Sequence, residues 1–389
     1  MAAYRYLIVG GGMTGDSACR GIREHDESGS IALFGAESHE PYARPPLTKG
    51  LWTGKEESSI WRGTPDLGVE LHEGVRIVAL DLDARTATDD AGGEHSYEKL
   101  LLATGGTPRR LHEGGDGVIY YRTVDDYRRL RELAGDGIRV TVVGGGFIGS
   151  EIAAALAMNG CDVTIVFPDP GIGAKLFPTE LSAFVNDYYR EKGVTVLAEQ
   201  LVEKISGDSV QTKDGTTVDG DAVVAGLGIE PNTDLAEAAG LDVDDGILVD
   251  EHGRAGGRED VFAAGDVARF PVAALGGSRR VEHEDHANTH GKVVGENMAG
   301  ADTPYDHIPF FYSDLFDLGY EAVGDVDSRL DTVEEWAEPN RKGVVAYVDG
   351  DGKARGFLLW DVWDKVDAAR ELIRAGTVVA AADLRPFLD

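Results

Sequence analysis

Glycines at a fixed spacing, followed by a carboxylate, are the clearest candidates for chemistry in this chain. Gly144, Gly146 and Gly149 form a GxGxxG pattern directly after the β-branched run 140–143, and Asp169 follows twenty residues beyond Gly149. Such glycines let backbone N–H groups approach a pyrophosphate, and such an acid can bind both ribose hydroxyls of an adenosine. A Gly-rich structural turn is the alternative. The complete strand–turn–helix–strand–acid order favours a nucleotide site.

A second set of glycines with the same spacing lies near the N-terminus. Gly10, Gly12 and Gly15 follow the apolar run 6–9, and Glu37 stands where the ribose-binding acid belongs, to within a residue. An N-terminal fingerprint is typical of FAD sites, and two fingerprints in one chain favour two dinucleotides. FAD and a nicotinamide cofactor are the natural pair, because one can reduce the other.

Lys49 and Arg44 are further candidates, because they are positive charges in a proline-rich segment of an acidic chain. The segment PYARPPLTK spans Pro41 to Lys49. Its prolines predict an extended approach to a short helix that includes Leu47 to Leu51. A solvated loop charge is the alternative interpretation of a lone lysine.

Histidines and cysteines suggest metal or disulfide chemistry only weakly. His283, His286 and His290 are spaced H-x-x-H-x-x-x-H on a helix expected around 282–297, unlike the HExxH zinc motif, so we expect no metal. Cys19 and Cys161 show no C-x-x-C spacing. We expect both cysteines to be buried, and their spacing excludes an active-site disulfide.

These candidates require strands that end at the glycine turns and helices that begin there. The pattern predicts an α/β fold with two Rossmann-like dinucleotide-binding domains, for FAD and NADH, and a C-terminal α+β interface domain. The predicted domains are 1–112 with 232–304 for FAD, 113–231 for NADH, and 305–389 for the interface. Expected strands lie at 6–9, 30–34, 98–103, 140–143, 162–167, 194–197, 218–225 and 261–264, and expected helices at 14–24, 125–133, 152–158, 180–192 and 363–375.

Alternating apolar residues predict an antiparallel sheet near the C-terminus. Val344, Ala346 and Val348 alternate, and the pattern resumes in the run 357–359. Trp360 and Trp363 are expected to pack within this domain.

The charge composition restricts the partners. The 389 residues carry a formal net charge of −32, which argues against nucleic acid and anionic membranes, since phosphate contacts need Lys and Arg. No apolar run of 18 or more residues occurs, and the first strand starts close to residue 4, so a cytoplasmic location is expected. Excess acid with few lysines also suits a protein that is soluble in high salt; a merely acidic enzyme is the alternative.

Several motifs together resemble one family of flavoproteins. PYARPPLTKGLW, GGGFIGSE, ATGGTPR (103–109), LGIEPN (227–232) and AAGD (263–266) are similar in order and spacing to the ferredoxin-reductase-like flavoproteins. The later stretches RRVEHEDHANTHGKVVGENMAG, YSDLFDLGYEAVGDVDS and GFLLWDVWDKVDAARELI resemble the apoptosis-inducing factor branch more closely. The animal members' leader and long C-terminal insertion are not seen, so DNA binding and a death role are not carried over.

This resemblance implies roles for individual residues. Lys49, Glu151, Phe147 and His283 are implied to act in catalysis: Lys49 pairs with Glu151 near flavin N5, and Phe147 covers the nicotinamide face. Asp266 follows the strand expected at 261–264, a helix is expected after it, and the resemblance implies that it binds the ribityl chain. Tyr312 takes a place where relatives commonly have Trp against the flavin. The full set of cofactor-binding candidates is Gly10, Gly12, Gly15, Glu37, Arg44, Lys49, Thr104, Gly105, Gly144, Gly146, Phe147, Gly149, Glu151, Asp169, Lys175, Gly228, Asp266, Glu282, His283 and Tyr312.

The implied activity is hydride transfer from NADH to non-covalently bound FAD, followed by electron transfer to an acceptor. A ferredoxin, a rubredoxin, a quinone or an artificial acceptor is expected, and a basic patch near Arg279 and Arg280 is a candidate docking surface for an acidic ferredoxin. Asp169 predicts NADH over NADPH, unless Lys175 overrides it. The alternative is a slow NADH-responsive binding protein that changes its association state, and either a monomer or a homodimer is compatible.

Overall fold

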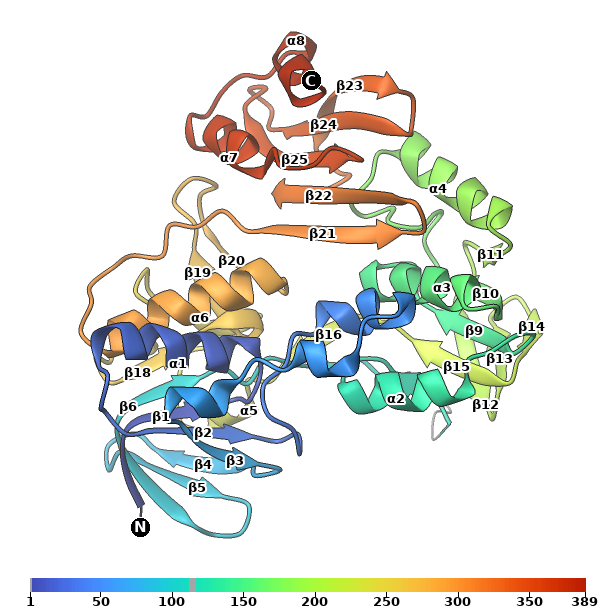
Figure 1. Ribbon diagram of the computed structural model, residues 1–389. Helices are drawn as coiled ribbons and strands as arrows, with labels where there is room; N and C mark the ends of the chain where they lie inside the picture. The colour runs from blue at the N-terminus through green and yellow to red at the C-terminus, as the bar shows by residue number, and fades with distance from the viewer. Residues whose placement is uncertain (1, 112–116) are drawn as a thin grey trace. The chain divides into compact units, whose positions relative to one another are not determined.

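The computed structural model describes residues 2–111 and 117–389, so the predicted boundary between residues 112 and 113 lies outside the described residues. The chain divides into two compact units (Figure 1). The first comprises Met1–Ala43, Glu57–Thr107 and Glu230–Pro309, and the second comprises Arg44–Glu56, Pro108–Ile229 and Phe310–Asp389. The predicted division into three domains stays a prediction.

The first unit is built on a mostly parallel sheet whose central strands are buried on both faces. The parallel strands run in the order β3-β2-β1-β6-β18, and β5 and β4 extend the sheet antiparallel from β6. They are β1 (Ala2–Val9), β2 (Ile31–Gly35), β3 (Glu70–Glu73), β4 (Ile77–Asp81), β5 (Thr86–Asp89), β6 (Glu94–Leu102) and β18 (Val261–Ala263). Continuous apolar runs of this kind favour a parallel sheet with both faces covered.

Successive residues of β1 point to two different cores, which makes this unit three-layered. Tyr6 and Ile8 pack with side chains of α1 (Met13–His25) and α6 (Glu284–Met298), and these two helices pack against each other. Leu7 and Val9 face a second core that includes α5 (Asp234–Ala238) and a small sheet. That sheet contains β17 (Ile247–Leu248), β19 (Ala268–Pro271) and β20 (Ser278–Arg280).

The second unit repeats the parallel pattern with different strands. Its sheet has the order β11-β10-β9-β15-β8 and is parallel throughout. The strands are β8 (Ile119–Tyr120), β9 (Arg139–Val143), β10 (Asp162–Val166), β11 (Thr195–Leu197) and β15 (Ala222–Ala225), and the helices are α2 (Val124–Leu133), α3 (Phe147–Met158) and α4 (Thr179–Glu191). The two Rossmann-like folds expected from the sequence are therefore confirmed.

The strand predicted from Val218 to Ala225 is wrong, because two strands occupy that range. A three-stranded antiparallel sheet of β12 (Val202–Ser206), β13 (Ser209–Thr212) and β14 (Thr217–Asp219) ends just before β15. Asp221 separates them and pairs with Arg139, with 2.7 Å between Oδ1 and Nη2. A charged residue held at the strand end breaks the apolar run.

The C-terminal part of the second unit is an antiparallel sheet with the order β21-β22-β25-β24-β23. Its elements are β21 (Phe310–Leu315), β22 (Leu318–Gly324), β23 (Asp331–Glu338), β24 (Lys342–Val348), β25 (Ala354–Trp360), α7 (Val366–Arg374) and α8 (Ala381–Leu384). β23 and β24 form a hairpin in which Glu338 pairs with Lys342, so no long insertion interrupts it. The expected antiparallel sheet is confirmed.

The structure adds two details to that prediction. Val345 and Tyr347, which alternate with Val344, Ala346 and Val348, are also buried, because both faces of β24 are covered. Trp360 is fully buried as expected, whereas Trp363 is 43% exposed. Trp363 precedes α7 in the chain, and its ring lies against Gly319.

The proline-rich segment also differs from its prediction. Instead of one helix through Leu47 to Leu51, two short 3-10 helices occur, at Pro45–Leu47 and Gly50–Thr53. The backbone of Lys49 between them lies outside the helical region, with φ −126° and ψ −98°. The short strands β7 (Gly106–Pro108) and β16 (Ile229–Pro231) complete the described strands. None of the described helices has the length and apolar character needed to span a membrane.

Candidate functional site

The turn between β1 and α1 has the geometry of a pyrophosphate cradle. Gly10 has φ +131°, and a Cβ there would lie 2.0 Å from the Ala103 carbonyl oxygen, so only glycine fits. Gly12 caps α1 without a side-chain hydrogen bond, and a Cβ on it would meet nothing within 4 Å. The open space therefore faces the free N–H groups of the helix start, where an anion is stabilised. The turn fits the adenine dinucleotide expected there.

The turn between β9 and α3 repeats this geometry in the second unit. Gly144 has φ +116°, and a Cβ on Gly149 would lie 1.9 Å from the Gly144 carbonyl oxygen. Gly146 caps α3, again with open space where a side chain would stand. The second cradle likewise fits a pyrophosphate.

The two predicted ribose acids follow the second strands of these motifs. Glu37 comes after β2, and its Oε2 accepts a hydrogen bond of 2.6 Å from the Tyr42 hydroxyl. Asp169 comes after β10, and its Oδ2 lies 3.9 Å from the Lys175 ammonium. Lys175 is 84% exposed, so water screens this contact strongly.

Lys49, Glu151 and two residues that the sequence did not reveal meet in a buried cluster. The Lys49 ammonium lies 2.5 Å from Glu151 Oε1, so the predicted ion pair is present. The Ser313 hydroxyl donates to the same oxygen at 2.6 Å, and the Thr48 hydroxyl donates to Oε2 at 2.5 Å. Thr48 could have been suspected from the sequence, since it lies inside the proline-rich motif. Ser313 could not, because no motif around it indicates a contact with residue 151.

Aromatic rings surround this cluster. The Lys49 ammonium lies over the Tyr312 ring, 5.2 Å from its centroid, which is cation–π range. Phe147, the first residue of α3, meets Phe311 edge-on with ring centroids 4.7 Å apart. Tyr312 stays 37% exposed. The second unit thus combines a nucleotide cradle, a buried ion pair and aromatic rings.

His283 and Glu282 stand at the start of α6 in the first unit. His283 caps the helix, and its burial lowers its pKa to about 4, against the opposing effects of Asp266 and Asp285. Glu282 Oε1 lies 2.6 Å from Arg280 Nη1. The structure therefore presents a neutral imidazole beside a neutralised carboxylate.

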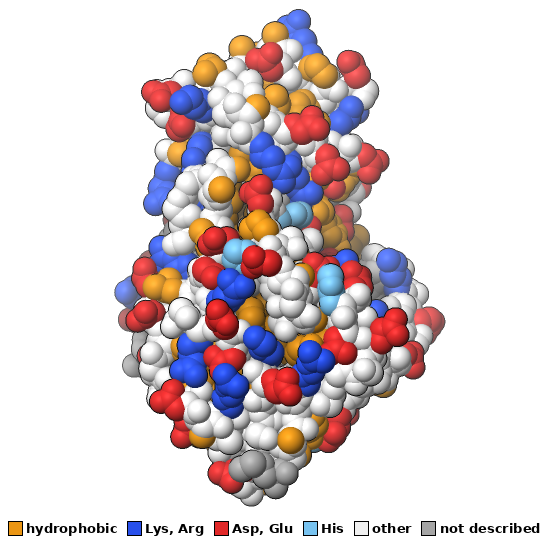
Figure 2. Space-filling view, turned by 90° about the vertical axis from the view of Figure 1, so that its left-hand side faces the viewer, with side chains coloured by type: hydrophobic (Ala, Val, Ile, Leu, Met, Phe, Trp, Pro, Cys, Tyr) orange, Lys and Arg blue, Asp and Glu red, His pale blue; other side chains and the backbone are white. Residues whose placement is uncertain are grey.

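The predicted basic patch near Arg279 and Arg280 is wrong for Arg280. Its guanidinium is only 9% exposed, because it bonds to Glu282 and lies 3.3 Å from Asp245. On the face shown in Figure 2, basic side chains lie among acidic ones instead of forming a patch of their own. A fully paired arginine offers little attraction to an acidic partner.

The remaining predicted residues lie in turns and at the ends of short elements. Asp266 sits in a 3-10 turn, Gly265–Val267, that leads into β19 and not into the helix that was expected. Arg44 donates to the Arg122 carbonyl at 2.9 Å, and Thr104 donates to the Asn232 carbonyl at 2.8 Å. Gly105 and Gly228 both have positive φ, at +62° and +79°.

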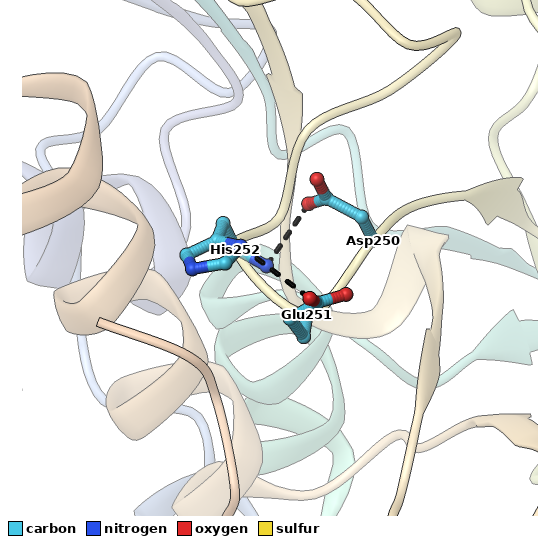
Figure 3. Close-up of side chains that lie close together, drawn as sticks. All are labelled: Asp250, Glu251 and His252. Carbon is cyan, nitrogen blue, oxygen red and sulfur yellow. Dashed lines mark hydrogen bonds and ion pairs between the residues drawn. The ribbon is translucent and has the colours of Figure 1, made fainter. Parts of the chain in front are cut away.

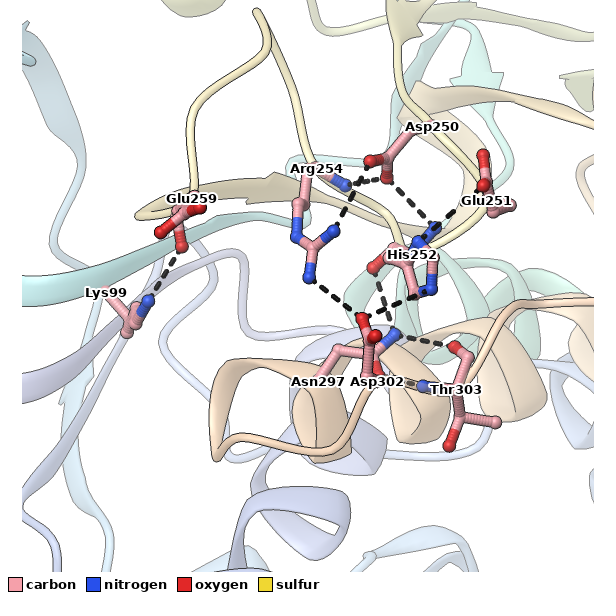
Figure 4. A network of polar contacts seen from close by, with 9 residues as sticks. All are labelled: Lys99, Asp250, Glu251, His252, Arg254, Glu259, Asn297, Asp302 and Thr303. Atoms are coloured by element: carbon pink, nitrogen blue, oxygen red, sulfur yellow. Dashed lines mark hydrogen bonds and ion pairs between the residues drawn. The ribbon is translucent and has the colours of Figure 1, made fainter.

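His286 and His290 are fully buried. Among the described residues, the group that meets metal-ligand spacing lies elsewhere: Asp250, Glu251 and His252 (Figure 3). Arg254 places a positive charge beside that group, with its Nη1 3.8 Å from Asp250 Oδ2. The acids also belong to a wider network that includes Asn297 and Thr303 (Figure 4). We interpret this cluster as a set of ion pairs and hydrogen bonds that fixes the C-terminal end of α6.

The chain's two cysteines, Cys19 and Cys161, are both buried and free, as expected. Burial raises the pKa of each thiol, so neither is a ready nucleophile.

Known proteins share the whole architecture. A family model described as pyridine nucleotide-disulphide oxidoreductase matches residues 4–291, and one described as apoptosis-inducing factor, mitochondrion-associated, C-term, matches residues 294–341. Apoptosis-inducing factor 1, mitochondrial, of Dictyostelium discoideum is 35% identical, over 95% of this chain and 78% of that protein. The ferredoxin–NAD(+) reductase component of the anthranilate 1,2-dioxygenase system of Burkholderia cepacia is 33% identical, over 97% and 96%.

A solved structure agrees with these relatives. The putidaredoxin reductase–putidaredoxin covalent complex superposes with a TM-score of 0.91 and 28% identity, over 100% of this chain and 96% of that chain. The resemblance and the α/β fold class expected from the sequence are confirmed, and so are FAD and NAD(H) as cofactors. The chain therefore belongs to the pyridine nucleotide-disulphide oxidoreductase family, and it is an FAD-containing, NADH-dependent oxidoreductase.

Proposed function

We propose that the chain passes electrons from NADH to a small one-electron carrier protein of the ferredoxin type. The buried Lys49–Glu151 pair next to the cradle of α3 is the observation that carries this proposal. Two of the proteins that match over nearly their whole length are named as a ferredoxin–NAD(+) reductase component and as putidaredoxin reductase. With its two cysteines buried and free, the chain has no disulfide for such electrons to pass through.

The chain's own residues prepare the place where hydride is transferred. Bound FAD supplies a group that accepts two electrons and releases them singly. The Lys49 ammonium and the Glu151 carboxylate form a largely buried ion pair, and the Thr48 hydroxyl adds a hydrogen bond to the carboxylate. The Tyr312 ring of β21 lies under the Lys49 ammonium, and Phe147 of α3 packs edge-on against Phe311, so aromatic rings stand at this place on both elements. A dry, oriented site lowers the cost of bringing the reacting groups together.

Flavin reduction measured directly tests the roles of these residues. Lys49→Ala and Glu151→Gln should each slow anaerobic reduction by NADH roughly 10–100-fold in stopped flow. Lys55→Ala is the matched control, because it removes a lysine from the same segment without touching the pair. Reduction at the wild-type rate in both pair variants would refute the assignment.

Turnover with different acceptors tests the carrier. Ferredoxin, rubredoxin and a soluble quinone should be compared at equal concentration, with ferricyanide as a check that the flavin is active. A kcat/KM for ferredoxin well above that for the others supports the proposal. A quinone that outperforms both proteins would replace it.

A second function has its own support. The match to the C-terminal model of apoptosis-inducing factor and the 35% identity to the Dictyostelium protein favour a slow NADH-responsive binding protein. Anaerobic NADH would then produce a long-lived long-wavelength absorbance band and a change between monomer and homodimer in light scattering. Rapid reoxidation by ferredoxin, with no change in mass, favours the reductase.

A further inference from the structure

The carboxylate of Glu151 is held by more than its ion pair. Oε1 accepts from Lys49 Nζ at 2.5 Å and from Ser313 Oγ at 2.6 Å, and Oε2 accepts from Thr48 Oγ1 at 2.5 Å. These donors come from the proline-rich segment and from β21, whereas Glu151 is the fifth residue of α3. Three chain segments of the second unit therefore meet at one side chain.

The two hydroxyls are more rigid anchors than the ammonium. Ser313 is fully buried and fixed by the register of β21, where it faces Tyr320 of β22. Thr48 is buried at the end of the first 3-10 helix, and its hydroxyl also lies 3.4 Å from the Pro45 carbonyl oxygen. Lys49 reaches Glu151 through a flexible four-carbon chain, which defines an orientation poorly. Short side chains on ordered backbone define it well.

We infer that Thr48 and Ser313 are positioning residues for hydride transfer: they aim the Glu151 carboxylate so that Lys49 is held in one place. The inference rests on the role proposed above for the Lys49–Glu151 pair. A buried carboxylate with room for about four hydrogen bonds loses orientation when one donor is removed. Displacement of a catalytic group by about 1 Å can cost on the order of 100-fold in rate.

The competing interpretation is that both hydroxyls only tie the segments together. In that case their loss lowers stability and leaves hydride transfer unchanged. The two interpretations differ in the reduction rate at saturating NADH and in the flavin midpoint potential, neither of which responds to a stability loss in a folded, FAD-loaded protein.

The test compares Ser313→Ala and Thr48→Val with Glu151→Gln in the FAD-loaded protein. Thr48→Ser keeps the hydroxyl, and Thr53→Val is the matched control, since the Thr53 hydroxyl donates to the Gly50 carbonyl of its own segment at 3.2 Å. We expect a reduction rate about tenfold lower in Ser313→Ala and Thr48→Val, with the NADH concentration for half-saturation changed less than about twofold. Thr48→Ser and Thr53→Val should keep the wild-type rate. The midpoint potential should shift in the same direction as in Glu151→Gln.

Each outcome decides between the interpretations. Wild-type rate and potential in Ser313→Ala and Thr48→Val, with a slow Glu151→Gln, would overturn the positioning role and leave the proposed function standing. A wild-type rate in Glu151→Gln itself would remove the proposed role of the pair and this inference with it. If Ser313→Ala does not retain FAD, the nearly isosteric pair Thr48→Val and Thr48→Ser gives the same decision.

Discussion

Acidification should destabilise the first unit, because two histidines are buried there as neutral imidazoles. His286 and His290 lie on α6 with no exposed surface. His286 Nδ1 is 3.0 Å from the Tyr305 hydroxyl, the Gly265 N–H donates to His290 Nδ1 at 3.3 Å, and neither Nε2 finds a hydrogen-bond partner among the described residues. Burial lowers the pKa of His290 to about 3, and burial with nearby histidines lowers the pKa of His286 well below its usual value.

The sign and size of the effect follow from proton linkage. In the unfolded chain a histidine titrates near ~6.5, so at about pH 5.5 the unfolded state binds a proton that the folded state does not. The stability is complete above the unfolded pKa and falls as the pH drops below it. From about pH 7.5 to about pH 5.5 each fully buried histidine should cost ~1.3 kcal/mol, and the two together ~2.7 kcal/mol. His283, with a pKa lowered to about 4, adds to this loss.

Urea titrations at the two pH values measure the loss of unfolding free energy. They are carried out in molar salt, so that the net charge of −32 is screened. Most carboxyl groups titrate near ~4 and contribute little above about pH 5.5. His290→Gln should remove about half of the change between the two pH values, whereas the exposed His25→Gln should leave it as in the wild type. Equal unfolding free energies at both pH values would show that the imidazoles are protonated or hydrated in the folded protein.

Three other predictions concern cofactor choice, salt and the flavin-side aromatic ring. Asp169→Asn should raise the ratio of NADPH to NADH efficiency about tenfold by removing repulsion of a 2′-phosphate, and a fall in NADPH use in Lys175→Ala would show that Lys175 offsets the acid. The KM for an acidic ferredoxin should fall with rising salt, because salt screens the charge of −32, and a KM independent of salt would contradict this. The melting temperature should rise in molar salt if the acidic surface is an adaptation to high salt, and an unchanged melting temperature would contradict that adaptation. Tyr312→Trp should intensify a reduced-flavin–NAD(+) charge-transfer band, and an unchanged band would place the ring away from the nicotinamide.

Both nucleotide cradles could be located from the sequence to within a few residues. Their signals are local: an apolar strand, glycines at fixed spacing and an acid after the next strand. The helix expected from Thr14 begins at Met13, and the strand expected to end at Phe167 ends at Val166. The backbone itself requires these residues, since a Cβ at Gly10 or Gly149 would overlap a carbonyl oxygen. Motifs that backbone sterics require can therefore be located from the sequence alone.

Predictions that depended on what a side chain contacts were less successful. Arg280 was assigned to a basic patch from its charge alone, although Glu282, two residues away, neutralises it. A helix was expected after Asp266, but a 3-10 turn leads into β19, because a strand pairing with β20 satisfies that backbone instead. The charge of a residue or its place at a strand end is compatible with several structures. Contacts with residues distant in sequence determine which of them forms.

Ser313 shows most clearly where sequence reasoning stops. It lies 162 residues from Glu151, and a serine in a strand is ordinary in itself. Its proposed role arises only because the antiparallel register of β21 turns its hydroxyl toward Glu151 of α3. We expect the glycine turn before α3 to bind the cofactor through its own local geometry, whereas the Glu151 carboxylate is hydrogen-bonded by segments distant in sequence. Substitution of a cradle glycine should therefore weaken NADH binding, and substitution of Ser313 should slow transfer while binding persists, so the two steps can be separated by mutation.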